Sequence, residues 1–287
     1  MEKSSLFQNY LVIFIDILGQ RNSLRQIKRL PTNEEENEKF ISGVKETLGK
    51  VESLRGSFEK YFDSLNAENA SADLVPKEYT SVLKESQKSE VYYYGISDSL
   101  IIAVPLINDN ENCKAIRGVY AALIATCGIG LIMLSEAIVI RGGLDVGIAT
   151  RIGDKEIYGP ALERAYFFEN TLAEYPRFLV GNELMQYLLS VEQKNCSTML
   201  GSLGQEAARS CKKLIIHDCD GRLMLDFLGV HIKEILFPAV IDEPLVEKAF
   251  NFVNSQCELF SEDNNFKLSS YYHRLLSYFK SRLSIWK

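Results

Sequence analysis

The segment VIFIDILGQ, residues 12–20, determines how the N-terminal half of the chain is interpreted. Residues 11–18 are apolar and rich in β-branched types except at Asp16, a pattern that predicts a buried strand. A carboxylate at the end of such a strand, shortly before Gly19, has two interpretations. It is either an ordinary turn residue or one half of a site that needs a second acidic group.

A second acidic residue occurs in the segment EVYYYGISDSLIIAVPL, residues 90–106, which predicts two strands joined by a tight turn at Asp98. If this hairpin lies beside the first strand, Asp16 and Asp98 project from one edge of the sheet. Two neighbouring carboxylates repel each other, and a divalent cation compensates that repulsion. We therefore predict two Mg²⁺ or Mn²⁺ ions here, because both metals prefer oxygen ligands and commonly bind substrate phosphates.

The backbone of residues 17–21 follows the first carboxylate, and its N–H groups are candidates for binding phosphates. The predicted substrate-binding residues in this loop are Leu18, Gly19 and Gln20, with the glycine allowing close approach of the ligand. The alternative is that the loop is only a strand end and that residues 95–99 form only a hairpin turn.

The predicted order of elements is strand, helix, hairpin, helix, strands, helix and strand, which indicates an α+β fold with an antiparallel-containing, ferredoxin-like central sheet. Residues 8–181 form the predicted main domain, with a polar insertion at about 64–90 and an amphipathic helix over 34–66. Residues 182–287 form a predicted C-terminal extension, with short strands near 214–227 and closing helices over 242–260 and 270–286.

Composition and charge narrow the class of protein. The chain of 287 residues carries a net charge of −6 without a basic run, which argues against nucleic-acid binding through a phosphate-tracking patch. Six scattered cysteines without zinc spacing, and an N-terminus without a signal sequence, predict free thiols and a cytoplasmic location. The apolar run 119–135 is short for a membrane span, and we predict a helix buried against the sheet.

Four segments together resemble the class III nucleotidyl cyclase domain: FIDILG (14–19), GISDSLIIA (95–103), VIRGGLDVGIA (139–149) and EIYGPALERAYFFEN (156–170). The resemblance implies that Asp16, Asp98 and the backbone carbonyl of Ile17 bind the two metal ions. It also implies that Arg141 contacts the triphosphate, a role that suits a guanidinium. An ordinary surface ion pair is the alternative for this arginine.

The sequence departs from this family pattern at the positions that bind the nucleotide base and at those that stabilise the transition state. Tyr92 stands where purine cyclases of the family usually place a base-reading lysine, and Tyr94 is close by. Because tyrosine is bulkier than lysine, tyrosines beside the base suggest that the substrate carries a smaller base than a purine. The alternative is that both tyrosines are ordinary strand residues, since tyrosine favours strands. Glu156 occupies the second base-reading position. The family's helical asparagine and arginine are replaced by Glu163 and Phe167; Arg164, one turn from Phe167, is a substitute for that arginine or a solvated helix residue.

With these replacements, the sequence resembles the pyrimidine cyclases of bacterial Pycsar antiphage systems. The resemblance implies conversion of UTP or CTP into a cyclic monophosphate that activates a separate effector, with UTP weakly favoured. It further implies a head-to-tail homodimer with its active sites at the interface. The charge balance and the short apolar run, rather than the resemblance, predict no role for nucleic acid or for a membrane.

Four alternatives stay open at this point. The first is a purine class III cyclase. The second is a diguanylate-cyclase or polymerase-palm enzyme, although the hairpin segment GISDSL is a poor match to the Gly-Gly-Asp/Glu-Glu-Phe hairpin that such an enzyme would carry. The third is a non-catalytic nucleotide sensor, and the fourth is a structural partner protein that uses an apolar face of the C-terminal helix.

Overall fold

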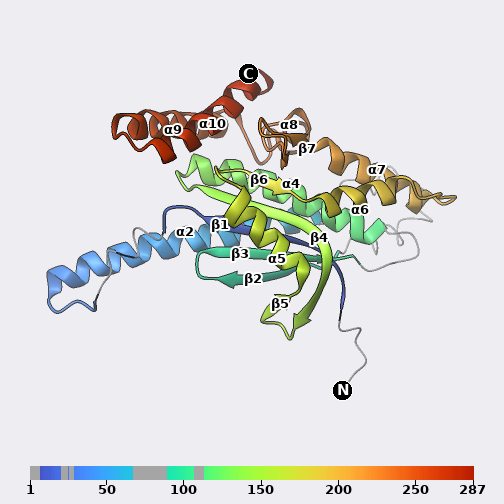
Figure 1. Cartoon of the computed structure of the whole chain (residues 1–287), viewed down its shortest axis with the longest axis horizontal. Helices are drawn as coiled ribbons and strands as arrows, with labels where there is room; N and C mark the ends of the chain where they lie inside the picture. The colour runs from blue at the N-terminus through green and yellow to red at the C-terminus, as the bar shows by residue number, and fades with distance from the viewer. Residues whose placement is uncertain (1–6, 21–24, 26–28, 67–88, 107–112) are drawn as a thin grey trace.

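The central sheet organises the molecule. The computed structural model describes residues 7–20, 25, 29–66, 89–106 and 113–287. Within these ranges the chain is an α+β protein with a mixed, mostly antiparallel eight-stranded sheet (Figure 1). The first four strands are β1 (Gln8–Ile17), β2 (Tyr92–Ile96), β3 (Ser99–Pro105) and β4 (Ile140–Ile152), and they lie in the order β2-β3-β1-β4.

Strand β1 lies between β3 and β4 and is antiparallel to both. Its side chains alternate between two buried faces, which explains why the segment is apolar almost throughout. At its end, Asp16 pairs with Ser99 of β3 on one side and with Arg141 of β4 on the other. The register therefore places these three side chains on one face of the sheet.

Two long helices cover the other face. Helix α2 (Glu34–Asn66) packs through Leu54, Phe58 and Phe62, all fully buried, whereas its N-terminal half projects from the body (Figure 1). Helix α4 (Cys113–Ser135) is long and apolar enough to cross a membrane, but 89% of its most apolar window is buried inside the fold. Its composition is accounted for by packing against the sheet on one side and further helices on the other.

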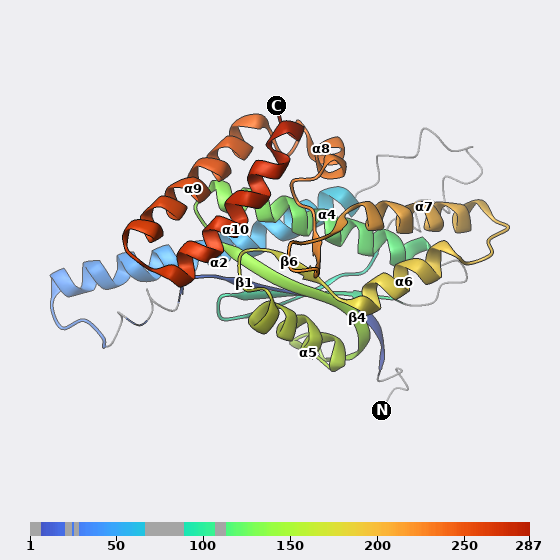
Figure 2. The same cartoon turned by 45° about the horizontal axis from the view of Figure 1, so that its top comes forward.

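The face that carries Asp16 is covered by α5 (Pro160–Phe167), as Figure 2 shows. Helix α5 follows the short strand β5 (Glu156–Tyr158), which pairs with the end of β4. It continues into a single π-helical turn, η3 (Phe168–Leu172). The close approach of η3 requires Gly143, because an added Cβ there would meet the carbonyl of Ala165 and the Phe168 side chain.

The C-terminal region extends the same sheet. Strand β6 (Phe178–Val180) runs parallel to β4, and beyond it lie β8 (Leu223–Leu225) and β7 (Ile215–His217). The helices of this region, which pack around α4 and the sheet edge, are α6 (Asn182–Glu192), α7 (Met199–Lys213), α8 (Val230–Leu236), α9 (Glu243–Glu262) and α10 (Phe266–Arg282), followed by the 3₁₀ turn η4 (Leu283–Ile285).

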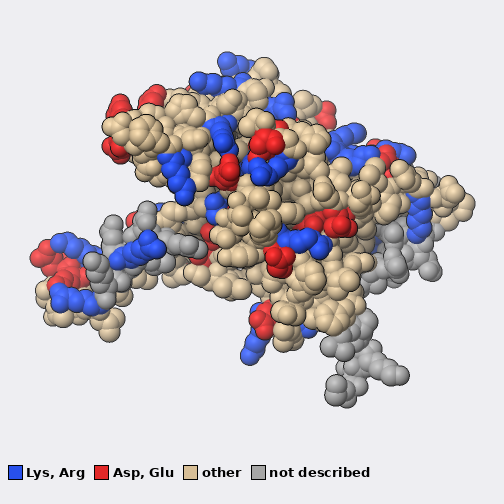
Figure 3. All heavy atoms as spheres, in the orientation of Figure 1, with Lys and Arg blue, Asp and Glu red and all other residues tan. Residues whose placement is uncertain are grey.

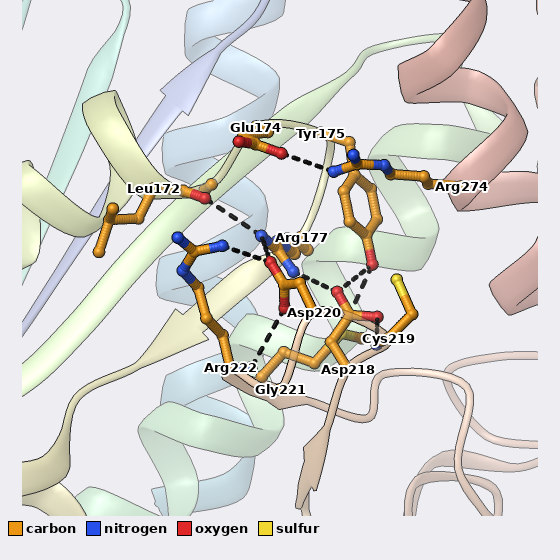
Figure 4. Close-up of polar contacts among 12 residues, drawn as sticks. Leu172, Glu174, Tyr175, Arg177, Asp218, Cys219, Asp220, Gly221, Arg222 and Arg274 are labelled. Carbon is orange, nitrogen blue, oxygen red and sulfur yellow. Dashed lines mark hydrogen bonds and ion pairs between the residues drawn. The ribbon is translucent and has the colours of Figure 1, made fainter.

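A buried arginine joins β6 to the turn between β7 and β8 (Figure 4). Arg177 is fully buried and pairs with the carboxylates of Asp218 and Asp220, and it also donates to the carbonyl of Leu172 at 3.1 Å. The Tyr175 hydroxyl donates to Asp218 at 2.6 Å. Because a buried guanidinium needs compensation by acidic groups, this network fixes the position of the turn.

The α+β class, the antiparallel strand pairs and the C-terminal helices are confirmed. The helix over 34–66, the hairpin around Asp98 and the closing helices α9 and α10 also occur as predicted. Most of the predicted insertion at 64–90 lies outside the described residues, as does position 21 of the predicted phosphate loop.

Candidate active site at the ends of β1 and β3

The two predicted metal-binding aspartates line the same cavity. This cavity has a volume of about 850 Å³ and lies between the β2–β3 turn and helix α5. Asp16 and Asp98 are both half-buried. The Ser99 hydroxyl donates to Oδ1 of Asp16 at 2.7 Å, whereas Asp98 makes no hydrogen bond or ion pair among the described residues. The sheet register thus brings the two carboxylates together as the sequence predicts.

The cavity is acidic. Besides the two aspartates, its lining includes Glu163 and Glu169 but no lysine, arginine or histidine among the described residues. Aromatic and amide side chains supply the remaining chemistry, in particular Tyr158, Tyr166 and Asn170. An anionic ligand would therefore enter this cavity only with cations that offset the repulsion of the carboxylates.

The chemistry of the donor set suits a hard divalent ion. Asp16 and Asp98 offer carboxylate oxygens, which Mg²⁺ and Mn²⁺ prefer. No group of three or more His, Cys, Asp or Glu side chains that could hold a metal alone occurs in the described part of the chain. Ions at this site would consequently complete their shells with water, backbone or ligand oxygens, as Mg²⁺ usually does when it binds phosphates.

The predicted phosphate-binding residues Leu18, Gly19 and Gln20 lie outside the cavity lining. The N–H of Leu18 donates to the carbonyl of Val139 at 2.8 Å, and the buried Gln20 side chain donates to the carbonyl of Thr47 at 3.1 Å. Gly19 is exposed and has φ = +89°, a conformation that favours glycine.

Arg141 lies beside the cavity with its charge already paired. Its Nε donates to Oε1 of Glu169 at 2.5 Å, and its Nη1 donates to the carbonyl of Ala173 at 3.3 Å. The Arg141 side chain is 16% exposed and that of Glu169 only 2%. The pair therefore joins β4 to η3, and Glu169 presents the acidic end of this link to the cavity.

Arg164 has a similar internal partner. It pairs with the buried Asp145 at 2.9 Å and donates to the carbonyl of Val146. Burial raises the pKa of Asp145, while hydrogen bonds from the Leu184 N–H and from Arg164 act in the opposite direction. Arg164 does not line the cavity. Its contacts tie α5 to β4 rather than directing the guanidinium toward a ligand at Asp16.

The predicted base-reading tyrosines form a separate cluster on the same sheet face. Arg151 lies over the Tyr92 ring at 3.6 Å, and its Nε donates to the Tyr94 hydroxyl at 3.2 Å. Burial, together with a hydrogen bond to Glu90, raises the pKa of Tyr92 to about 12, so its hydroxyl is neutral at physiological pH. Glu156 lies in β5 opposite Ile152 and is exposed.

Within one chain, Tyr92 lies farther from the aspartates than Tyr94, which pairs with Ile101 of the cavity lining. Tyr92 pairs with Ala103, four residues along β3 from the Ser99 partner of Asp16, which corresponds to roughly 14 Å along a strand. The buried side chains of α5 and β1 fill the space between them, notably Phe14 and Ala165. Tyr92 and the aspartates are therefore separate groups on one face of the sheet within one chain.

Several site residues escaped the sequence analysis. Two of them could have been found from the sequence: Ser99 is a polar residue next to Asp98, and Asn170 is a polar residue in the helical segment 156–170. The pairing of Glu169 with Arg141 and the stacking of Arg151 on Tyr92 could not have been found in this way, because both contacts join segments that are distant in sequence.

Comparison of the chain with models of protein families, with curated proteins and with solved structures found no match.

Proposed function

We propose that the protein is a metal-dependent pyrimidine nucleotide cyclase of the class III type, converting UTP or CTP into the 3′,5′-cyclic monophosphate and pyrophosphate. The observation that carries the proposal is the convergence of Asp16 and Asp98 on one cavity of about 850 Å³. The order β2-β3-β1-β4, with helices after β1 and β3, supports the finer assignment to a ferredoxin-like cyclase fold.

In the proposed reaction the 3′-hydroxyl oxygen forms a bond to the α-phosphorus, and the bond from that phosphorus to the pyrophosphate oxygen breaks. The hydroxyl proton passes to solvent or to the leaving group. Divalent ions held by Asp16, Asp98 and the carbonyl of Ile17 would activate the hydroxyl and neutralise the leaving group. Asp16 is oriented for this role by the Ser99 hydroxyl. Positioning and charge neutralisation supply most of the proposed rate enhancement.

A homodimer is part of this proposal. Because Tyr92 and the aspartates are separated on one chain, a complete site would combine the aspartates of one protomer with the tyrosines and Glu156 of its partner. Three residues of the cavity lining are exposed apolar side chains that suit such an interface, namely Ile96, Tyr158 and Tyr166. Figure 3 shows uncharged surface around the β2–β3 hairpin, with acidic and basic side chains in the region of α5.

A second candidate is a nucleotide sensor that binds without turnover. It is favoured by one observation: Arg141 and Arg164, the two arginines expected to contact phosphates, both pair with carboxylates of their own chain. In a cyclase, the missing positive charge has to come from the metal ions or from the partner protomer.

Incubation of the purified protein with each of ATP, GTP, UTP and CTP, in the presence of Mn²⁺ or Mg²⁺, tests the proposal through product identification by mass spectrometry. We expect a cyclic monophosphate from UTP or CTP only. Cyclic purine products would indicate the wider cyclase family, linear GTP dimers a diguanylate-cyclase-like enzyme, and bound nucleotide without product the sensor.

Two variants and a control complete this experiment. Asp16→Asn and Asp98→Asn are expected to fold and to lose at least about 100-fold in turnover, because each removes a charge on which metal binding depends. Asp63→Asn, an exposed carboxylate on α2, should keep full activity. Undiminished turnover in both site variants would overturn the metal assignment.

A further inference from the structure

The turn that carries Asp98 is held from behind the sheet by an arginine of α2. Nη2 of Arg55 donates to the carbonyl of Ser97 at 2.9 Å and to that of Ser99 at 3.2 Å. These two carbonyls flank Asp98 on either side. Ser97 has φ = +54°, a left-handed conformation that costs energy in a residue other than glycine. The turn therefore adopts a conformation that its own sequence does not favour, and Arg55 bonds both of its ends.

Gly95 makes the space for this guanidinium. An added Cβ at Gly95 would lie well inside 3.0 Å of three Arg55 guanidinium atoms. Tyr93, two residues earlier on the same face, packs against Phe58 and Phe62 of α2, so this face is opposite to the one that carries the cavity. Arg55 thus contacts the turn without contacting the cavity.

The chain that follows Asp16 also contacts helix α2. Gln20, which follows the end of β1, donates to the carbonyl of Thr47, eight residues before Arg55 and on the same side of α2. One rigid helix therefore contacts the chain just after Asp16 and the turn around Asp98. Nε of Arg55 is also buried and makes no hydrogen bond among the described residues, an arrangement that stability alone does not favour.

We propose that Arg55 is a positioning residue for Asp98, fixing the backbone of its turn so that the carboxylate meets the ion shared with Asp16. The effect on metal binding rests on the proposed function, whereas the effect on the turn does not. Gly95 is the counterpart of Arg55 in this role, because its lack of a side chain admits the guanidinium.

The test uses Arg55→Ala, Gly95→Ala and the double variant, with Lys60→Ala, an exposed cation on α2, as the control. Amide hydrogen exchange at residues 97–99 is expected to accelerate about tenfold or more in Arg55→Ala and Gly95→Ala, since the turn loses its anchor. The double variant should match Arg55→Ala, because Gly95→Ala acts by displacing a group that is already absent. Lys60→Ala should leave this exchange unchanged.

The second readout is Mn²⁺ binding, followed by electron paramagnetic resonance without nucleotide turnover. We expect the dissociation constant for Mn²⁺ to rise about tenfold in Arg55→Ala, because a misplaced ligand weakens a site whose geometry matters. Unchanged exchange at residues 97–99 would overturn the positioning role whatever the protein's activity. Faster exchange with unchanged Mn²⁺ affinity would overturn it as well, provided that Asp98→Asn weakens Mn²⁺ binding. If Asp98→Asn has no effect either, the proposed function fails instead.

Discussion

At the scale of single residues, the position of a site residue could be predicted only where the residue that it contacts could also be predicted. Asp16 and Asp98 converge because both stand at the ends of neighbouring strands, and strand register follows from the alternation of side chains. The family resemblance predicts a triphosphate contact for Arg141 and, as one of two alternatives, a transition-state role for Arg164, both from local motifs alone. Their actual partners, Glu169 and Asp145, lie 28 and 19 residues away in sequence, and no periodicity indicates such a contact.

The Arg141–Glu169 pair gives a prediction about stability. Glu169→Gln leaves an almost buried guanidinium without its counter-charge, so we expect the free energy of unfolding to fall by about 3–5 kcal/mol. Urea denaturation followed by circular dichroism measures this loss. Asp154→Asn is the matched control, because Asp154 pairs with Arg151 but its side chain is 97% exposed. The control should cost at most about 1 kcal/mol, and equal losses in the two variants would contradict the buried role of Glu169.

The Arg177 network gives a prediction about acid sensitivity. The hydrogen bond from Arg177 holds the pKa of Asp220 well below its ordinary value of 3.8. The unfolded chain therefore binds the proton first, and the stabilisation is complete above the ordinary pKa and is lost as the pH falls below it. We expect Asp220→Asn to lose less stability than the unaltered protein between about pH 5 and about pH 3, measured by urea denaturation. Parallel losses would show that this carboxylate is not the acid-sensitive group.

At the scale of elements, the sequence pattern predicts the long periodic segments together with their packing, whereas for the short strands it predicts the position in the chain but not the pairing. Helix α2 and strands β1, β3 and β4 follow from hydrophobic period and length. Strand β6 is the last strand of the predicted order, and β7 and β8 occur where short strands are predicted near 214–227, but the pattern does not predict that β7 and β8 extend the central sheet, because three residues carry no period. The π-helical turn η3 was also missed, because it depends on the packing of α5 against β4 rather than on local propensity.

The contact between η3 and β4 gives the prediction at this scale. Gly143→Ala should lower the free energy of unfolding by about 1–3 kcal/mol, since the added methyl overlaps the backbone of α5 and η3. Gly56→Ala on the exposed side of α2 meets nothing within 4 Å and should instead stabilise the protein by about 0.5–1 kcal/mol. Thermal unfolding measures both effects. Unaltered stability in Gly143→Ala would contradict the tight packing of η3 on the sheet.

At the scale of the whole molecule, the separation of two groups on one sheet face is the main constraint on function. The apolar patch under α5 connects the two groups: Phe14 and Ile101 of this patch line the aspartate cavity, whereas Tyr92 packs against the patch outside the cavity lining. Either the two groups serve different ligands, or a second chain brings a tyrosine cluster to each cavity. The exposed apolar side chains of the cavity lining favour the second possibility.

Complementation between two inactive variants decides between these possibilities. In a two-fold symmetric dimer with shared sites, an Asp16→Asn chain and a Tyr92→Ala chain together form one intact site and one doubly defective site. Random mixing makes half of the dimers hybrid, so cyclase activity should recover to roughly a quarter of that of the unaltered protein. Each variant alone should stay inactive, and mixing Asp16→Asn with Asp98→Asn should restore nothing, because both changes affect the same half-site. No recovery in the first mixture would place each complete site within one chain, whereas recovery in the control would show that Asp16 and Asp98 act from different chains.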